Sequence, residues 1–97
     1  MSKLEVYDTI KTRNLCLVDR NDIERVLLSA DDGSPTIELL DSQGRMRVEL
    51  TLEKYGRTYL SIFGEDGAPR IDINVTREGH PSFHMYDTNG DILWSKP

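Results

Sequence analysis

The stretch LLDSQGRMRVEL, from Leu39 to Leu50, decides the fold of this 97-residue chain. Asp41 and Gly44 stand three residues apart, between two segments in which apolar and polar residues alternate. Alternation with a period of two is typical of a β-strand with one apolar face, and Asp and Gly at this interval are typical of a turn. The stretch therefore predicts a β-hairpin.

The hairpin pattern recurs along the whole chain. Gly44, Gly67 and Gly90 follow each other at intervals of 23 residues. Asp22 takes the place of the glycine in the first unit, 22 residues before Gly44. The segments between hairpins, ADDGSP, EKYGR and REGHP, are rich in Gly, Pro and charge, which indicates return turns. We therefore expect an antiparallel meander of about eight strands. Its four hairpin units span approximately residues 13–30, 36–53, 58–76 and 81–95.

The register of the strands follows from the faces that they present. A four-residue turn at 41–44 would set Leu39 opposite Met46, apolar against apolar, whereas a three-residue turn would bring polar residues opposite apolar ones. The four-residue register, carried through all units, collects the apolar side chains on one face, which we predict to be the core. The residues of this predicted core are Leu15, Leu17, Val26, Leu28, Ile37, Leu39, Met46, Val48, Leu50, Leu52, Leu60, Ile62, Ile71, Ile73, Val75, Phe83, Met85, Ile92 and Trp94.

A single sheet with one apolar face must cover that face. The sheet can curl on itself, fold into a sandwich or pair with another copy, and closure also removes the two exposed edges. We expect an all-β fold in a single domain, residues 1–97, as a rolled sheet or a small up-and-down barrel. A sandwich and an intertwined oligomer stay open as alternatives, and LEVYDTI near the N-terminus is a candidate for an extra strand.

Composition narrows the classes of function. Twelve Lys and Arg residues against seventeen Asp and Glu residues give a net charge of −5 without a basic cluster, which disfavours nucleic-acid and anionic-membrane partners. The N-terminus lacks the apolar segment of a signal peptide, and no run of 18 apolar residues occurs. Cys16 is the single cysteine. These features predict a chain in a reducing, cytoplasmic location.

The repeat resembles known families. The consensus LxLxDxxGxxRxxL, seen best from Leu39 to Leu50, is similar to that of uncharacterised bacterial β-hairpin repeat proteins and covers roughly residues 13–95. This resemblance implies the hairpin fold and no activity. The period of the hairpins also resembles that of MORN repeats, but the chain lacks their YxGxxxxGxxxGxG pattern, so their lipid and scaffold roles are not carried over.

Two groups of residues are weighed as metal or catalytic sites. Asp87, Asn89 and Asp91 surround Gly90 as in part of a calcium loop, but the first ligand position and the bidentate Glu position carry other residues. His80 and His84 lie four apart, which on a strand separates them by roughly 13 Å. We therefore expect no metal, no cofactor and no catalytic residues.

An arginine column is predicted on the polar face. Arg25, Arg47 and Arg70 occupy matching positions of successive hairpins. They could bind an anion, since a guanidinium binds carboxylates and phosphates in a bidentate manner, or they could form a cross-strand charge ladder with Glu38 opposite Arg47. The ladder is preferred because acids match the bases in number. Cys16 is predicted opposite Arg25 as an inert small residue.

A second recurrent set on the polar face is apolar. These residues lie beside the turn, and they could form a contact patch or be covered by the stems of the arginines. They are Val18, Leu40, Phe63 and Tyr86.

Two functions follow. We expect a non-enzymatic structural or protein-interaction module that self-associates through this patch as a homo-oligomer. The alternative is a small-ligand domain, for example for a carbohydrate, that uses aromatic platforms. Those aromatics are Tyr86, Phe63, Tyr59 and Trp94.

Overall fold

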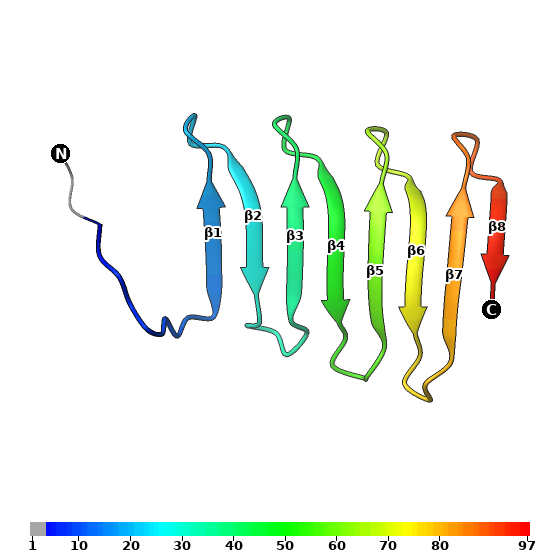
Figure 1. The fold of residues 1–97 in the computed structure, drawn as a ribbon, viewed down its shortest axis with the longest axis horizontal. Helices are drawn as coiled ribbons and strands as arrows, with labels where there is room; N and C mark the ends of the chain where they lie inside the picture. Colours follow the sequence, from blue (N-terminus) through cyan, green and yellow to red (C-terminus); the bar gives the residue numbers. More distant parts are fainter. Residues whose placement is uncertain (1–3) are drawn as a thin grey trace.

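One antiparallel sheet contains all the strands that the computed structural model describes in residues 4–97 (Figure 1). Its eight strands pair in chain order, each with its sequence neighbours, so the predicted all-β meander is confirmed. The strands are β1 (Asn14–Val18), β2 (Glu24–Ser29), β3 (Thr36–Leu40), β4 (Met46–Leu52), β5 (Thr58–Phe63), β6 (Pro69–Val75), β7 (Pro81–Tyr86) and β8 (Ile92–Lys96).

The turn between β3 and β4 is closed by Asp41 and Arg45. The Asp41 amide donates to the Arg45 carbonyl at 2.8 Å, and the Gly44 amide donates to the Asp41 carbonyl at 3.0 Å. Gly44 has a φ of 81°, a left-handed conformation that glycine adopts without steric cost. Asp41 Oδ1 accepts the amides of Gln43 and Arg45 at 2.9 and 3.0 Å. The loop therefore has three residues, and the predicted four-residue turn is wrong.

The predicted register is wrong by two residues, whereas the alternation of faces that it gave for the strand interiors is correct. Leu39 faces Val48 instead of Met46, and a β-bulge between Leu39 and Leu40 shifts the pairing so that Leu40 faces Met46. A shift of two keeps every side chain on its face, because side chains alternate with a period of two. Matching bulges interrupt the other three hairpins, before Val18, Phe63 and Tyr86.

The pairing gathers the apolar side chains into rows that cross the sheet. One row takes one residue from each strand and runs from Leu17 in β1 to Trp94 in β8. A second row runs parallel to it, from Leu15 in β1 to Phe83 in β7. We call this side of the sheet the apolar face. Its residues are Leu15, Leu17, Val26, Leu28, Ile37, Leu39, Val48, Leu50, Leu52, Leu60, Ile62, Ile71, Ile73, Val75, Phe83, Met85 and Trp94.

The apolar face is not a core. Between Leu4 and Pro97 no hydrophobic side chain is buried, and Ile37 and Leu50 are 42% and 40% exposed. The predicted core is therefore wrong for the isolated chain, because no second layer covers the face. The strands β1 and β8 lie at opposite ends of the sheet (Figure 1). The predicted small barrel is wrong for the same reason, and an open, rolled sheet is the compatible form.

The segment before β1 does not extend the sheet. Its residues from Leu4 to Arg13 form no strand, so the predicted extra strand in LEVYDTI is wrong. Leu4 and Val6 lie open to solvent. The segment leads away from the β1 edge, which therefore stays unpaired within the described chain (Figure 1).

Candidate interaction surfaces

The apolar face is the largest candidate interaction surface. Eight strands about 4.8 Å apart, each five to seven residues long at about 3.3 Å per residue, give it an area of roughly 700 Å². Stable protein interfaces bury about 800 Å² on each partner, whereas isolated exposed apolar residues need no explanation. The face is therefore large enough to be one side of a specific interface.

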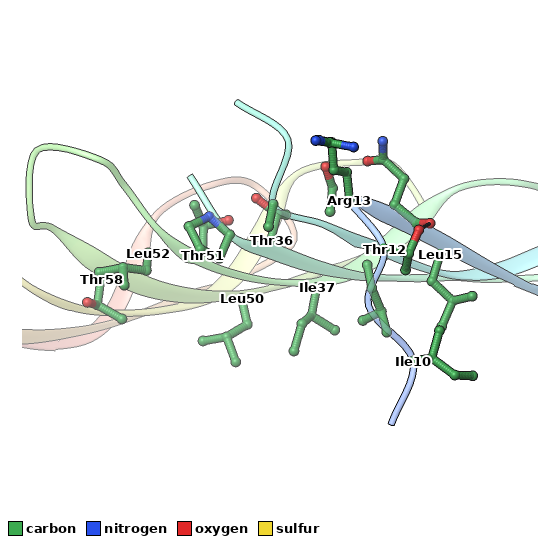
Figure 2. A pocket seen from close by; sticks show the side chains of 15 residues that line it. Ile10, Thr12, Arg13, Leu15, Thr36, Ile37, Leu50, Thr51, Leu52 and Thr58 are labelled. Atoms are coloured by element: carbon green, nitrogen blue, oxygen red, sulfur yellow. Dashed lines mark hydrogen bonds between the residues drawn. The ribbon is translucent and has the colours of Figure 1, made fainter. Parts of the chain in front are cut away.

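One end of the apolar face is hollowed. A pocket of about 510 Å³ lies where the segment before β1 passes the sheet, and Ile10 from that segment lines it. Figure 2 shows Ile10, Leu15, Ile37 and Leu50 on one side of the sheet and Thr51 on the other. The hollow continues the apolar face toward the N-terminal segment.

The opposite side, which we call the polar face, is better covered. The residues that are buried within 4–97 are Thr51 and Ser61, 5% and 6% exposed, and both belong to this face. Ser61 Oγ donates to Asp72 Oδ1 at 2.6 Å, and Asn74 Nδ2 donates to Ser82 Oγ at 2.7 Å. Short polar side chains are therefore hydrogen-bonded to one another across neighbouring strands on this face.

The arginine column joins neighbouring hairpins. Arg25 Nε donates to the carbonyl of Leu40 at 2.8 Å, and Arg47 Nε donates to the carbonyl of Phe63 at 2.8 Å. Leu40 and Phe63 lie beside the register shifts of β3–β4 and β5–β6, where the partner strand carries the extra residue of the bulge. Each arginine thus binds a carbonyl at a bulge in the next hairpin, where the strand ladder is interrupted. Arg25 and Arg47 thus have hydrogen-bond partners within the described chain, the two backbone carbonyls.

Arg70 breaks this pattern and stays on its own turn. Its Nη2 donates to Asp66 Oδ2 at 2.9 Å, and the arginine lowers the pKa of that carboxyl. A Cβ at Gly64 would lie 2.9 Å from Arg70 Nη2. The turn has glycine where the other hairpins have Asp, and a side chain there would have to displace the end of the flexible Arg70 side chain.

The predicted charge ladder does not form as expected. Glu38 faces Glu49 across β3 and β4, and the predicted pairing of Glu38 with Arg47 is wrong. The two-residue register shift is the cause. Burial and the facing Glu38 raise the pKa of Glu49. By the same shift Cys16 faces Leu27 instead of Arg25. The binding of an anion by the arginine column stays a prediction.

The residues of the predicted contact patch lie next to the bulges, on the strand of each hairpin that has no extra residue. Val18 is 54% exposed, whereas Leu40, Phe63 and Tyr86 are half-buried. The Tyr86 ring stacks on His84 with 6.2 Å between centroids. A contact role for the patch stays a prediction, since the four residues belong to four separate hairpins.

The aromatic residues considered for a carbohydrate do not gather at one place. Trp94 lies on the apolar face and packs edge-to-face on Phe83 with 5.3 Å between ring centroids. Tyr59 and Tyr86 belong to the polar face, where Tyr59 faces Thr51. A single sugar ring could not contact all of them.

The turn carboxylates bind backbone amides. Asp87 Oδ1 accepts the amides of Asn89 and Asp91 at 2.9 and 3.0 Å, as Asp41 does in its own turn. Within residues 4–97 no three His, Cys, Asp or Glu side chains come together in a way that could hold a metal ion. Nor does that range contain a helix long and apolar enough to cross a membrane.

Sequence reasoning missed the row of residues at the middle of the polar face. Cys16, Leu27, Glu38 and Glu49 are evenly spaced along the chain, at an interval equal to one strand with its turn. The pairing places them side by side across β1 to β4. Their even spacing was the signal that could have found this row.

Comparison with known proteins adds no relative. No protein-family model matches the chain, and no curated protein matches it. The resemblance to bacterial hairpin-repeat proteins accordingly stays a prediction.

Proposed function

We propose that this protein is a non-enzymatic structural or interaction module that self-associates by stacking its apolar face on that of a second copy. The observation that carries the proposal is the exposure of a whole apolar sheet face, with no buried hydrophobic side chain between Leu4 and Pro97. A domain of this size gains its stability from apolar burial, so an uncovered face of roughly 700 Å² calls for a partner layer.

A second copy fits the charge distribution of the chain. The net charge of −5 opposes the approach of two copies through most of their surface. The apolar face carries no acidic residue along its two central rows, and Lys96 lies at its edge opposite Phe83. Two copies therefore meet at lowest electrostatic cost through this face.

The geometry of such a dimer is that of a sandwich. Two sheets pack about 10 Å apart with their strands within about 30° of each other, and their inner side chains interdigitate. The same face on both copies gives an isologous, two-fold interface that closes. Such a dimer would bury roughly 1,400 Å² in total, within the usual range for stable complexes.

A matched pair of substitutions in β6 tests the proposal. Ile73 belongs to the apolar face and Asn74 to the polar face, so Ile73→Asp and Asn74→Asp add the same charge on opposite sides. Sedimentation velocity over a range of concentrations should show a discrete dimer for the wild type and for Asn74→Asp. Ile73→Asp should be monomeric or unfolded, because a carboxylate in the stacked layer is left unpaired.

The wild type keeps the test decisive even if Ile73→Asp does not fold. An obligate dimer is more stable at higher protein concentration, so the melting temperature should rise with concentration. A folded wild-type monomer at every concentration would overturn the proposal. Phe63→Asp is the third arm: if it breaks the oligomer while Ile73→Asp does not, the interface is the patch at the bulges.

A further inference from the structure

A hollow on the polar face holds acidic side chains without basic ones. Its volume is about 660 Å³, within the range of small-ligand sites. The described residues that line it include no Lys or Arg. They include four carboxylates, those of Asp32, Glu38, Glu49 and Glu53. Glu53 is paired with Arg57, with 2.5 Å between Oε1 and Nη2. The other three leave the hollow strongly negative.

Glu38 and Glu49 form the centre of this charge. They face each other directly across β3 and β4, an arrangement that is unfavourable for like charges. No ion pair found within residues 4–97 includes either of them. The nearest arginines on the same face, Arg25 and Arg47, donate to the carbonyls at the bulges instead. The protein itself thus supplies no cation to this pair.

Thr51 supplies an independent observation. It is 5% exposed and lines the hollow, yet its Oγ1 has no hydrogen-bond partner of normal geometry in the described chain. Burial raises the pKa of Glu49, and the Thr51 hydroxyl, two residues further along the same face, is close enough to lower it in part. A buried hydroxyl without a partner is unfavourable, and an N–H donor in the hollow would satisfy it.

We propose that this hollow binds an organic cation, with an ammonium or guanidinium group between Glu38 and Glu49 and one of its N–H groups donated to Thr51 Oγ1. Charge-assisted hydrogen bonds from such groups to carboxylates are strong, and a guanidinium can engage two oxygens at once. Leu27 and Tyr59 line the hollow as well and offer apolar contact to the carbon chain of the cation.

The chemistry favours an organic cation over a metal ion. The described residues contain no cluster of three ligands suited to a metal, and Ca²⁺ binds six to eight oxygens. The ring of Tyr59, which lines the hollow, already has a guanidinium beside it, since Arg57 Cζ lies 4.9 Å from the ring centroid. The hollow lies opposite the apolar face, so a stacked dimer leaves it open, and the two proposals can fail separately.

Titration of the full chain with two probes tests the inference and identifies the source of the cation. Agmatine represents a free small amine, and a neutral-capped Gly-Arg-Gly peptide represents a protein side chain. Backbone amide shifts in NMR spectra should change at Glu38, Glu49, Thr51 and Tyr59. The tighter of the two probes shows whether the natural cation is a metabolite or a residue of a protein.

Three variants separate a built site from general attraction. Glu49→Gln should weaken binding about tenfold, as expected for loss of a charge-assisted contact. Glu65→Gln, which removes an equal charge from an exposed turn, should change it less than about twofold at fixed salt. Thr51→Val should weaken binding severalfold, because it removes the hydroxyl acceptor while it keeps the shape of the side chain.

Weaker binding by Thr51→Val in a chain that keeps its fold is what a merely structural residue would not give. Equal weakening by Glu65→Gln and Glu49→Gln would overturn the inference, because it would mean unspecific attraction. So would equal competition by Ca²⁺ at the same ionic strength, or the absence of shifts at the four amides with both probes at millimolar concentration.

Discussion

The two faces of the sheet are covered in opposite ways. The polar face buries Thr51 and Ser61, whereas the apolar face leaves Leu50 and Ile62 40% and 36% exposed. These residues alternate along β4 and β5, so the same backbone serves both sides. The difference comes from the side chains above it: arginine, glutamate and tyrosine are long enough to lie over their neighbours, and Leu, Ile and Val are not.

This comparison shows where the chain is complete and where it is not. Apart from the hollow around Glu38 and Glu49, the polar face has its partners within the chain, including the bonds of Arg25 and Arg47 to the carbonyls beside the bulges of neighbouring hairpins. The apolar face has none, although it carries the residues that bury most favourably. The face that looks like an interior thus has no covering layer within the described chain.

The largest effect should come from Ile62→Ala, set against its neighbour Ser61→Ala. In a stacked dimer Ile62 is buried, and its loss should cost about 2–4 kcal/mol of unfolding free energy. Ser61→Ala removes the 2.6 Å bond to Asp72 and should cost about 1 kcal/mol. Urea unfolding at two protein concentrations measures both.

The concentration arm sharpens this result. The proposed dimer should gain stability with protein concentration, and Ile62→Ala should reduce that gain by weakening association, whereas Ser61→Ala should leave it unchanged. If Ile62→Ala costs no more than Ser61→Ala, the apolar face is as uncovered in solution as in the single chain.

Much of the fold could be predicted from residue alternation and turn chemistry. Alternation from Ile37 to Leu50 gives the faces, and Gly44 at a φ of 81° explains the glycine of the repeat. The bulge before Leu40 was not predictable, because a one-residue irregularity leaves the apolar pattern intact. The register error that resulted carried over to the arginine column and placed Glu38 opposite the wrong partner.

The lack of a second layer could not be predicted either. An apolar face gives the same sequence pattern whether the sheet closes on itself or another chain covers it. The even spacing of Cys16, Leu27, Glu38 and Glu49 did hold the information for the pairing of the two glutamates. To use this spacing, one must know how many residues a strand and its turn contain together. That number depends on both the three-residue loop and the bulge.

A smaller effect should distinguish two arginines of the polar face. Arg47→Met removes the 2.8 Å bond to the Phe63 carbonyl, which joins two hairpins, and should cost about 1 kcal/mol. Arg45→Met removes an exposed pair with Asp41 inside one turn and should cost clearly less, because solvent screens exposed ion pairs. Thermal unfolding of both variants in the same buffer measures the difference. Equal losses would mean that the polar face is not held together by bonds between hairpins.

The smallest effect, and the one with a pH signature, should come from Glu49→Gln. Burial and Glu38 raise the pKa of Glu49 in the folded protein above its value of 4.5 in an unfolded chain. The folded state therefore binds this proton more tightly, so stability is highest below the unfolded pKa and is lost as the pH rises through the folded pKa. At neutral pH the ionised pair is fully unfavourable, and Glu49→Gln should raise the melting temperature.

The gain from Glu49→Gln should disappear as the pH falls below the carboxyl range, because the wild-type side chain is then neutral as well. Glu38→Gln is the matched control: it relieves the same repulsion, so the double variant should gain less than the sum of the two single ones. The turn carboxyl of Asp41 works in the other direction. Partial burial raises its pKa, but the amides of Arg45 and Gln43 lower it by more, so its contribution is lost only at still lower pH. A gain from Glu49→Gln that persists unchanged into acid would show that the two carboxylates on the polar face do not repel each other.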